Sequence, residues 1–183
     1  YKKLQDRYKV AEIGAAAACL TLIENPDAEL TGAVLNRIAE RHGHLAAVRE
    51  PLLLREDLAV ETRQALVAKL SDTLARFVAH REWLPEERAH NVAREACDRV
   101  TVAIAAETDS REVTHLIRHL VASGQLTGGL MLRALIAGNL RFLVEALAEL
   151  TKNLTDTQIQ TENRRYHGQR LLGLVVAAVD SME

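Results

Sequence analysis

The sequence predicts an all-α protein: a compact bundle of eight or nine helices, stacked as hairpins in a HEAT-like or α-solenoid-like manner. The 183 residues are 48% hydrophobic and 26% charged, a balance typical of a folded chain. Only 9 Gly, 3 Pro and 3% aromatic residues leave little material for turns or sheet faces. Apolar residues recur with the helical period between helix-ending signals. We expect one domain over residues 1–183, with a subdivision into 1–56, 57–107 and 108–183.

The first third of the chain should contain three helices. A first helix is expected from the N-terminus to Glu24, where Asn25-Pro26 ends it. Thr31 is placed to cap a second helix, which ends at Gly43. A short helix over residues 45–54 should be broken or restarted at Pro51.

A long helical hairpin is expected in the middle of the chain. One helix should span residues 58–81, and Leu84-Pro85 followed by two glutamates should start the next. The small residues of the second helix predict a close approach between the two. The residues expected to pack together are Leu70, Leu74 and Phe77 against Ala93, Ala96 and Val100.

The last third is divided by caps and glycines. Asp109, with Glu112 three residues later, should start a helix that stops at Gly124, and Thr127 should cap the next. A helix over residues 140–151 follows, and a capping box at Thr155 should start another. An apolar helix over residues 171–182 should end the chain. Residues 30–37 resemble residues 126–133, which is compatible either with a repeat or with two similar helix entries.

The second half of the chain resembles a bacterial protein family. The stretches that carry the resemblance are SGQLTGGLMLRAL (123–135), GNLRF (138–142) and EALA (145–148), preceded by DL (57–58), ALV (65–67), SD (71–72) and WLP (83–85). Over residues 45–150 they are similar to the family called domain of unknown function 2336. The resemblance implies an all-helical, HEAT-like bacterial protein without an assigned activity, and it supplies no catalytic residues.

Composition and charge argue against several partners and locations. The formal net charge of −2 gives no field that favours nucleic acid or an anionic membrane. A helix over residues 140–151 would expose Glu145 and Glu149, which phosphates would repel. The apolar run at residues 14–23 is too short to span a bilayer. Cys19 and Cys97 lack the spacing of a zinc site or disulfide framework, so we expect a cytoplasmic protein with reduced thiols.

Two histidines are the best candidates for site chemistry. His115 and His119 are four residues apart and share a helix face, as two metal ligands would. The stretch lacks the glutamate of a zinc-protease motif, and Arg118 would repel a cation. We therefore expect a solvated polar face and neither metal nor other cofactor. No nucleophile or nucleotide-binding motif is present, which predicts a protein that is not an enzyme.

These observations predict a protein-interaction module with an unknown protein partner. The candidate partner-binding residues are Arg133, Asn139 and Arg141, because two guanidinium groups beside a turn suit a carboxylate-rich segment. A homodimer through the apolar helix at 171–182 is a further expectation. The alternative is a bacterial signalling component that binds a small ligand or carries a phospho-accepting histidine.

Overall fold

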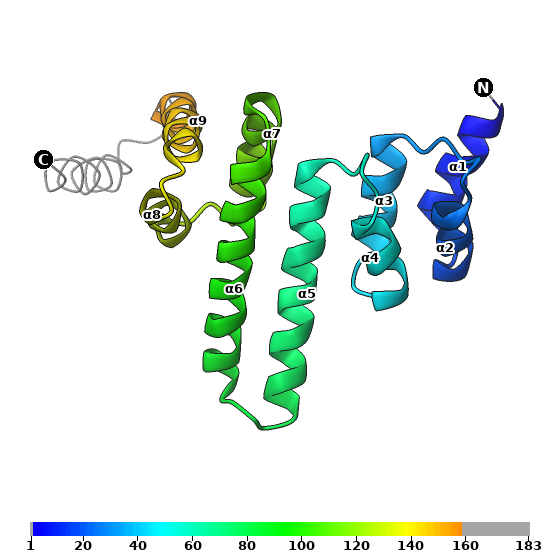
Figure 1. The fold of residues 1–183 in the computed structure, drawn as a ribbon, viewed down its shortest axis with the longest axis horizontal. Helices are drawn as coiled ribbons and strands as arrows, with labels where there is room; N and C mark the ends of the chain where they lie inside the picture. Colours follow the sequence, from blue (N-terminus) through cyan, green and yellow to red (C-terminus); the bar gives the residue numbers. More distant parts are fainter. Residues whose placement is uncertain (1, 159–183) are drawn as a thin grey trace, which may run out of the picture. The chain divides into compact units, whose positions relative to one another are not determined.

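The computed structural model describes residues 2–158, and in this part of the chain every regular element is an α-helix. The all-α prediction is confirmed, whereas the HEAT-like stacking stays a prediction. Figure 1 shows the helices in chain order. Their bounds are α1 Lys2–Ile13, α2 Ala16–Glu24, α3 Gly32–His42, α4 Ala46–Leu53, α5 Val60–His80, α6 Glu86–Glu107, α7 Ser110–Ala122, α8 Gly128–Ile136 and α9 Leu140–Gln158.

The chain divides into two compact units, one over residues 1–116 and one from residue 117 onward. We call them unit 1 and unit 2 and describe each by itself. The expectation of one domain, with its three-part subdivision, stays a prediction.

The core of unit 1 is built by α1–α4 and the start of α5. Its buried cluster includes Ile38, Leu52 and Leu66, all with no exposed surface. Polar contacts at the edge of the core join α1 to α3. Arg37 makes a two-pronged ion pair with Glu12, with Nη2–Oε1 and Nε–Oε2 distances of 2.7 and 2.8 Å. Arg41 donates to the carbonyl oxygen of Ala11, which satisfies one of the last carbonyls of α1.

The ion pair between α1 and α3 predicts a pH dependence. The hydrogen bond from Arg37 lowers the pKa of Glu12 below its ordinary value of 4.5. Because the folded-state pKa is depressed, the pair stabilises the fold above the ordinary pKa, and this contribution is lost as the pH falls through the folded-state pKa. Glu12→Gln should therefore lower the melting temperature at neutral pH, and the gap to the parent should close in acid. Thermal melts over a pH series test this, with Glu24→Gln, at an exposed position at the end of α2, as the control.

The prediction of one continuous first helix is wrong, because the helix is interrupted between α1 and α2. Gly14 follows α1, and Ala15 is extended with φ −68° and ψ 160°. A Cβ on Gly14 would lie 2.4 Å from the carbonyl oxygen of Val10, so a side chain there would force the backbone to shift. The break allows the Cys19 thiol to contact that same oxygen at 3.5 Å while Cys19 is buried.

Two further local predictions in this region need correction. Thr31 is the residue before α3, but its side chain makes no capping hydrogen bond. Pro51 lies inside α4, which continues through it to Leu53 and is neither broken nor restarted there.

The long hairpin forms as predicted, but α5 turns a different face toward α6. Small side chains lie between the helices: Ala75 and Ala89 are buried, and Ser71 lies close enough to Cys97 to lower the pKa of its thiol, which burial raises. Leu74 and Phe77 were expected in this seam and instead have exposed fractions of 52% and 46%. Of the other expected seam residues, Leu70 and Ala93 are half-buried, and Ala96 and Val100 are exposed.

The reason for this correction is rotational. Successive residues of a helix are about 100° apart, so a seam centred on Ala75 leaves Leu74 on the flank of the hairpin. Small side chains in the seam let two helix backbones approach closely, and Leu74 and Phe77 in that position would hold them apart. Leu66 is buried all the same, because it packs in the core cluster of α1–α4.

Side-chain caps start two helices at the predicted positions. Asp109 Oδ1 accepts hydrogen bonds from the backbone N–H groups of Arg111 and Glu112, at 2.8 and 2.9 Å, at the start of α7. Thr127 accepts from Leu130 N–H at 3.1 Å at the start of α8. The predicted helix start at Thr155 is wrong, because α9 runs through this residue to Gln158. The predicted helix at 171–182 lies outside the described residues.

Replacing the cap of α7 tests its contribution. Asp109→Ala removes the acceptor for two N–H groups and should cost about 1 kcal/mol of unfolding free energy, within a range of roughly 0.5–2. Asp109→Asn keeps an oxygen acceptor and should recover most of the loss. Urea denaturation followed by circular dichroism measures both variants. Equal destabilisation by Ala and Asn would show that the cap hydrogen bonds contribute little.

The described part of unit 2 has its own buried side chains. Phe142 and Leu130 have exposed fractions of 0% and 1%. At the edge of the unit, Glu149 of α9 lies between Arg118 and Lys152, with N–O distances of 3.8 and 3.5 Å. The other buried residues are Ile117, Leu120, Met131, Ala134, Leu143 and Ala146.

Candidate protein-interaction surface

The α5–α6 hairpin exposes one apolar side, which we call the hairpin face. Leu74 and Val92 each have an exposed fraction of 52%, and Val100 has 41%. A groove of about 200 Å³ opens on this side, with lining residues from both helices, Leu74 and Val78 from α5 and Val92 and Ala96 from α6 among them. The hairpin face consists of Val67, Leu70, Leu74 and Val78 of α5 and Val92, Ala93, Ala96 and Val100 of α6.

The sequence forms this face through two parallel stripes. On α5 the members are spaced by three and four residues, so they follow one side of the helix. On α6, Val92, Ala96 and Val100 are spaced by four residues, and Ala93 lies next to Val92 on the side of the seam. Both stripes lie beside the seam of small residues, and the shared groove shows that they are on the same side of the hairpin.

The other side of the hairpin is polar. Asp72 and Arg76 form an ion pair there at 2.6 Å, and Arg94 donates to Asn91 at 3.0 Å. All four side chains are exposed. A hairpin exposed to water on both sides would carry polar residues on both sides. The exposed apolar side therefore indicates a surface that another molecule covers.

Aromatic residues occupy the tip of the hairpin. The rings of Phe77 and Trp83 meet edge to face, with centroids 5.7 Å apart and planes at 88°. The Arg81 guanidinium lies over the Phe77 ring at 5.4 Å. Glu82 has a positive φ of 57°, which allows the tight turn between the helices. Trp83 remains 67% exposed, so the apolar surface extends around the tip.

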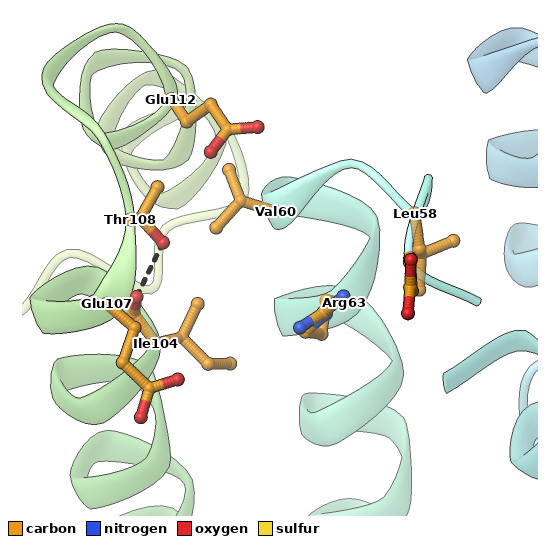
Figure 2. A pocket seen from close by; sticks show the side chains of 8 residues that line it. Leu58, Val60, Arg63, Ile104, Glu107, Thr108 and Glu112 are labelled. Carbon is orange, nitrogen blue, oxygen red and sulfur yellow. Dashed lines mark hydrogen bonds between the residues drawn. The ribbon is translucent and has the colours of Figure 1, made fainter. Parts of the chain in front are cut away.

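An acidic pocket lies at the other end of the hairpin (Figure 2). Its volume is about 250 Å³, and carboxylates of Glu56, Glu107 and Glu112 line it together with Arg63. Arg63 Nη2 donates to the Arg55 carbonyl oxygen at 3.4 Å. In the described residues no group of three or more His, Cys, Asp and Glu side chains is arranged to hold a metal ion. The pocket therefore carries no assigned chemistry.

The residues predicted to bind a partner lie around the α8–α9 turn of unit 2. Arg133 is half-buried in the last turn of α8, and Asn139 caps α9 by accepting from Phe142 N–H at 3.1 Å. Arg141 is exposed in the first turn of α9. Arg133 Nε and Asn139 Nδ2 are buried donors without a hydrogen-bond partner among the described residues. Asn139 thus has a structural role, and the partner-binding role of the three residues stays a prediction.

The titratable residues singled out in the sequence are placed as follows. His115 is exposed and His119 half-buried on α7, and the phospho-accepting alternative stays a prediction. Cys19 and Cys97 are buried free thiols, and burial raises the pKa of both. Each thiol therefore stays protonated at neutral pH, which suits a packing role more than a reactive one.

A second apolar strip is exposed on unit 2. Ile136 at the end of α8 and Val144 on α9 have exposed fractions of 79% and 63%. Leu132 of α8 and Leu140 at the start of α9 are exposed as well.

Comparison with known proteins identifies the family. The family model described as "Uncharacterised protein conserved in bacteria (DUF2336)" matches residues 9–178. The chain belongs to this family. The DUF2336 match confirms the resemblance seen at residues 45–150 and extends it at both ends, across both units. No curated protein and no solved structure matches the chain. No helix in the described part of this DUF2336 member is long and apolar enough to cross a membrane.

Sequence reasoning missed the hairpin face. The stripe containing Leu70 and Leu74 was visible, but it was assigned to the seam with α6. A signal was present in the small residues Ser71 and Ala75, whose spacing of four marks the side that allows close helix approach.

Proposed function

We propose that the chain is a non-enzymatic protein-interaction module whose binding surface is the hairpin face. The observation that carries the proposal is the apolar groove between α5 and α6, flanked by exposed Leu74, Val92 and Val100. Exposed apolar patches of this kind are typical of protein-binding surfaces. The groove lies between the apolar stripes of α5 and α6, and such a groove suits the apolar side of another helix. We therefore expect the partner to present an apolar helical surface.

The surroundings of the face support this proposal. Outside the face, exposed charges such as the Asp72–Arg76 ion pair favour contact with water, so the apolar side is the part of the hairpin suited to a partner. The formal net charge of −2 argues against nucleic acid as the partner. A cytoplasmic location belongs to the proposal, and the two buried free thiols are compatible with it.

Photo-crosslinking in bacterial cells tests the proposed surface. A benzophenone amino acid is placed at position 74 or 92, one on each helix of the face, and at position 91 on the polar side. We expect the same covalently bound protein from positions 74 and 92, and none from position 91. Whether the captured protein is a second copy or another protein does not matter for this test.

A second variant makes the result specific. Ala96→Glu places a charge in the groove and should abolish crosslinking from position 92, while circular dichroism shows an unchanged helix content. Crosslinks that are equally abundant at positions 91 and 92, or no crosslink from the face of a folded protein, would overturn the proposed function.

A further inference from the structure

We infer that residues 171–182, which the sequence predicts to form an apolar helix, pack along α8 and α9 of the same molecule and cover the second apolar strip. We call it the unit 2 strip; it consists of Leu132, Ile136, Leu140 and Val144, each more than half exposed. The unit 2 strip is not part of the hairpin face, so the inference goes beyond the proposed function and does not rest on it.

On α8, the unit 2 strip lies opposite the buried side of the helix. The buried stripe of α8 contains Leu130 and Ala134. The exposed Leu132 and Ile136 each follow one of these residues by two positions, which is about 200° around the helix. The strip is therefore the part of α8 that is turned away from the interior of unit 2.

The same relation holds on α9. Its buried side contains Phe142 and Ala146. The exposed Leu140 and Val144 each precede one of these residues by two positions, again about 200° around the helix. The helices α8 and α9 pack against each other (Figure 1). Because the buried stripes of both helices face the interior of unit 2, the exposed stripes together form one outer apolar side.

The chain after α9 contains a segment that matches this side in polarity. Residues 171–179 read LLGLVVAAV and contain no polar or charged side chain. Residues 159–170 read IQTENRRYHGQR and are mostly polar, which suits a connection in contact with water. The family model extends to residue 178, so the sequence pattern of the family includes most of the apolar segment. The segment and the strip both need covering, and each can cover the other.

The connection is long enough to bring the segment onto the strip. From Val144 to the end of α9 at Gln158 the helix rises about 21 Å. Residues 159–170 can span up to about 40 Å when extended, so the segment can return along α9. A connection this short gives an effective concentration on the order of 1 mM. That concentration favours the strip of the same chain over the strip of a second copy.

The charges around the α8–α9 turn fit the direction of this return. Arg133 lies in the last turn of α8, and Arg141 lies in the first turn of α9. A segment that runs from the end of α9 toward its start brings the Asp180 carboxylate to this turn. Arg133 Nε is buried without a hydrogen-bond partner among the described residues, and a carboxylate beside it would supply an acceptor.

Maleimide labelling of the full chain tests whether the unit 2 strip is covered. Val144→Cys places a thiol on the strip, and the two native cysteines are buried and should not react. Leu174→Asp together with Val176→Asp puts charges on both sides of the apolar segment. This pair should raise the labelling rate at position 144 at least about tenfold, because a charged segment leaves the strip. An unchanged rate would overturn the inference.

Two control cysteines make this result specific. Ser123→Cys is exposed just after α7, and its labelling rate should be the same with and without the two aspartates. Ala146→Cys is buried in unit 2 and should stay unreactive in both backgrounds. If position 146 becomes reactive, the aspartates have unfolded the unit. The test is then repeated with Leu174→Ser and Val176→Ser, which remove apolar surface without adding charge, and it is judged in the same way.

Disulfide formation distinguishes the same chain from a second copy. Val144→Cys is combined in one chain with cysteine at position 174, 175 or 176, and the chains are oxidised at about 1 µM, well below the effective concentration. We expect an intramolecular disulfide from at least one of these pairs on a non-reducing gel. A disulfide-linked dimer as the main product would place the segment on a second copy. That result, or no disulfide from any pair, would overturn the inference.

Discussion

Phe142→Ala should lower the unfolding free energy of unit 2 by about 3–5 kcal/mol. Phe142 has no exposed surface and is the largest fully buried side chain in the described residues. Its removal should leave a cavity among the buried side chains of unit 2, such as Leu130 and Ala146. The expected loss therefore includes the transfer free energy of the removed ring and the cost of the cavity that it leaves.

Hydrogen exchange read by mass spectrometry measures this loss where it occurs. Peptides from residues 140–152 should lose protection in Phe142→Ala, whereas peptides from α3 and α4 should keep it. Val144→Ala is the matched control, because it shortens a side chain on the same helix that is 63% exposed. Equal losses of protection in the two variants would contradict the buried position of Phe142.

Local signals predicted some of the helix boundaries. Asp109 and Thr127 cap α7 and α8 through hydrogen bonds to backbone N–H groups two or three residues ahead. Gly43 ends α3, and Gly124, with a φ of 68°, follows the end of α7. Such signals are carried by neighbouring residues, so they can be identified without the rest of the fold.

Two other capping patterns led to wrong predictions, because their spacing does not show whether the cap forms. Thr155 with Gln158 has the spacing of a capping box, yet α9 continues through it to Gln158. Thr31 precedes α3 without capping it. A serine or threonine three residues before a glutamine or glutamate permits a cap and does not require one.

The candidate surface was the hardest part to predict. Periodicity shows that Leu70 and Leu74 share a helix side, but it does not show what covers that side. The default assumption that a leucine stripe faces the neighbouring helix failed, because Ser71 and Ala75 allow closer packing than the leucines do. Arg133, Asn139 and Arg141 were found from charge and turn chemistry, and the structure gives Asn139 the role of capping α9 through Phe142 N–H.

Leu66→Ala should lower the unfolding free energy of unit 1 far more than Leu74→Ala does. Both leucines lie on α5, two turns apart, with exposed fractions of 0% and 52%. Leu66→Ala should cost about 2–5 kcal/mol, because its cavity opens in the core of unit 1, where a Cβ on Gly43 would already lie 2.6 Å from Leu66 Cδ2.

Leu74→Ala should cost less than about 1 kcal/mol, because the side chain is half in water already. Urea denaturation followed by circular dichroism measures both losses, and we expect the loss for Leu66→Ala to be the larger by at least about 1 kcal/mol. A large loss for Leu74→Ala would return this residue to the α5–α6 seam.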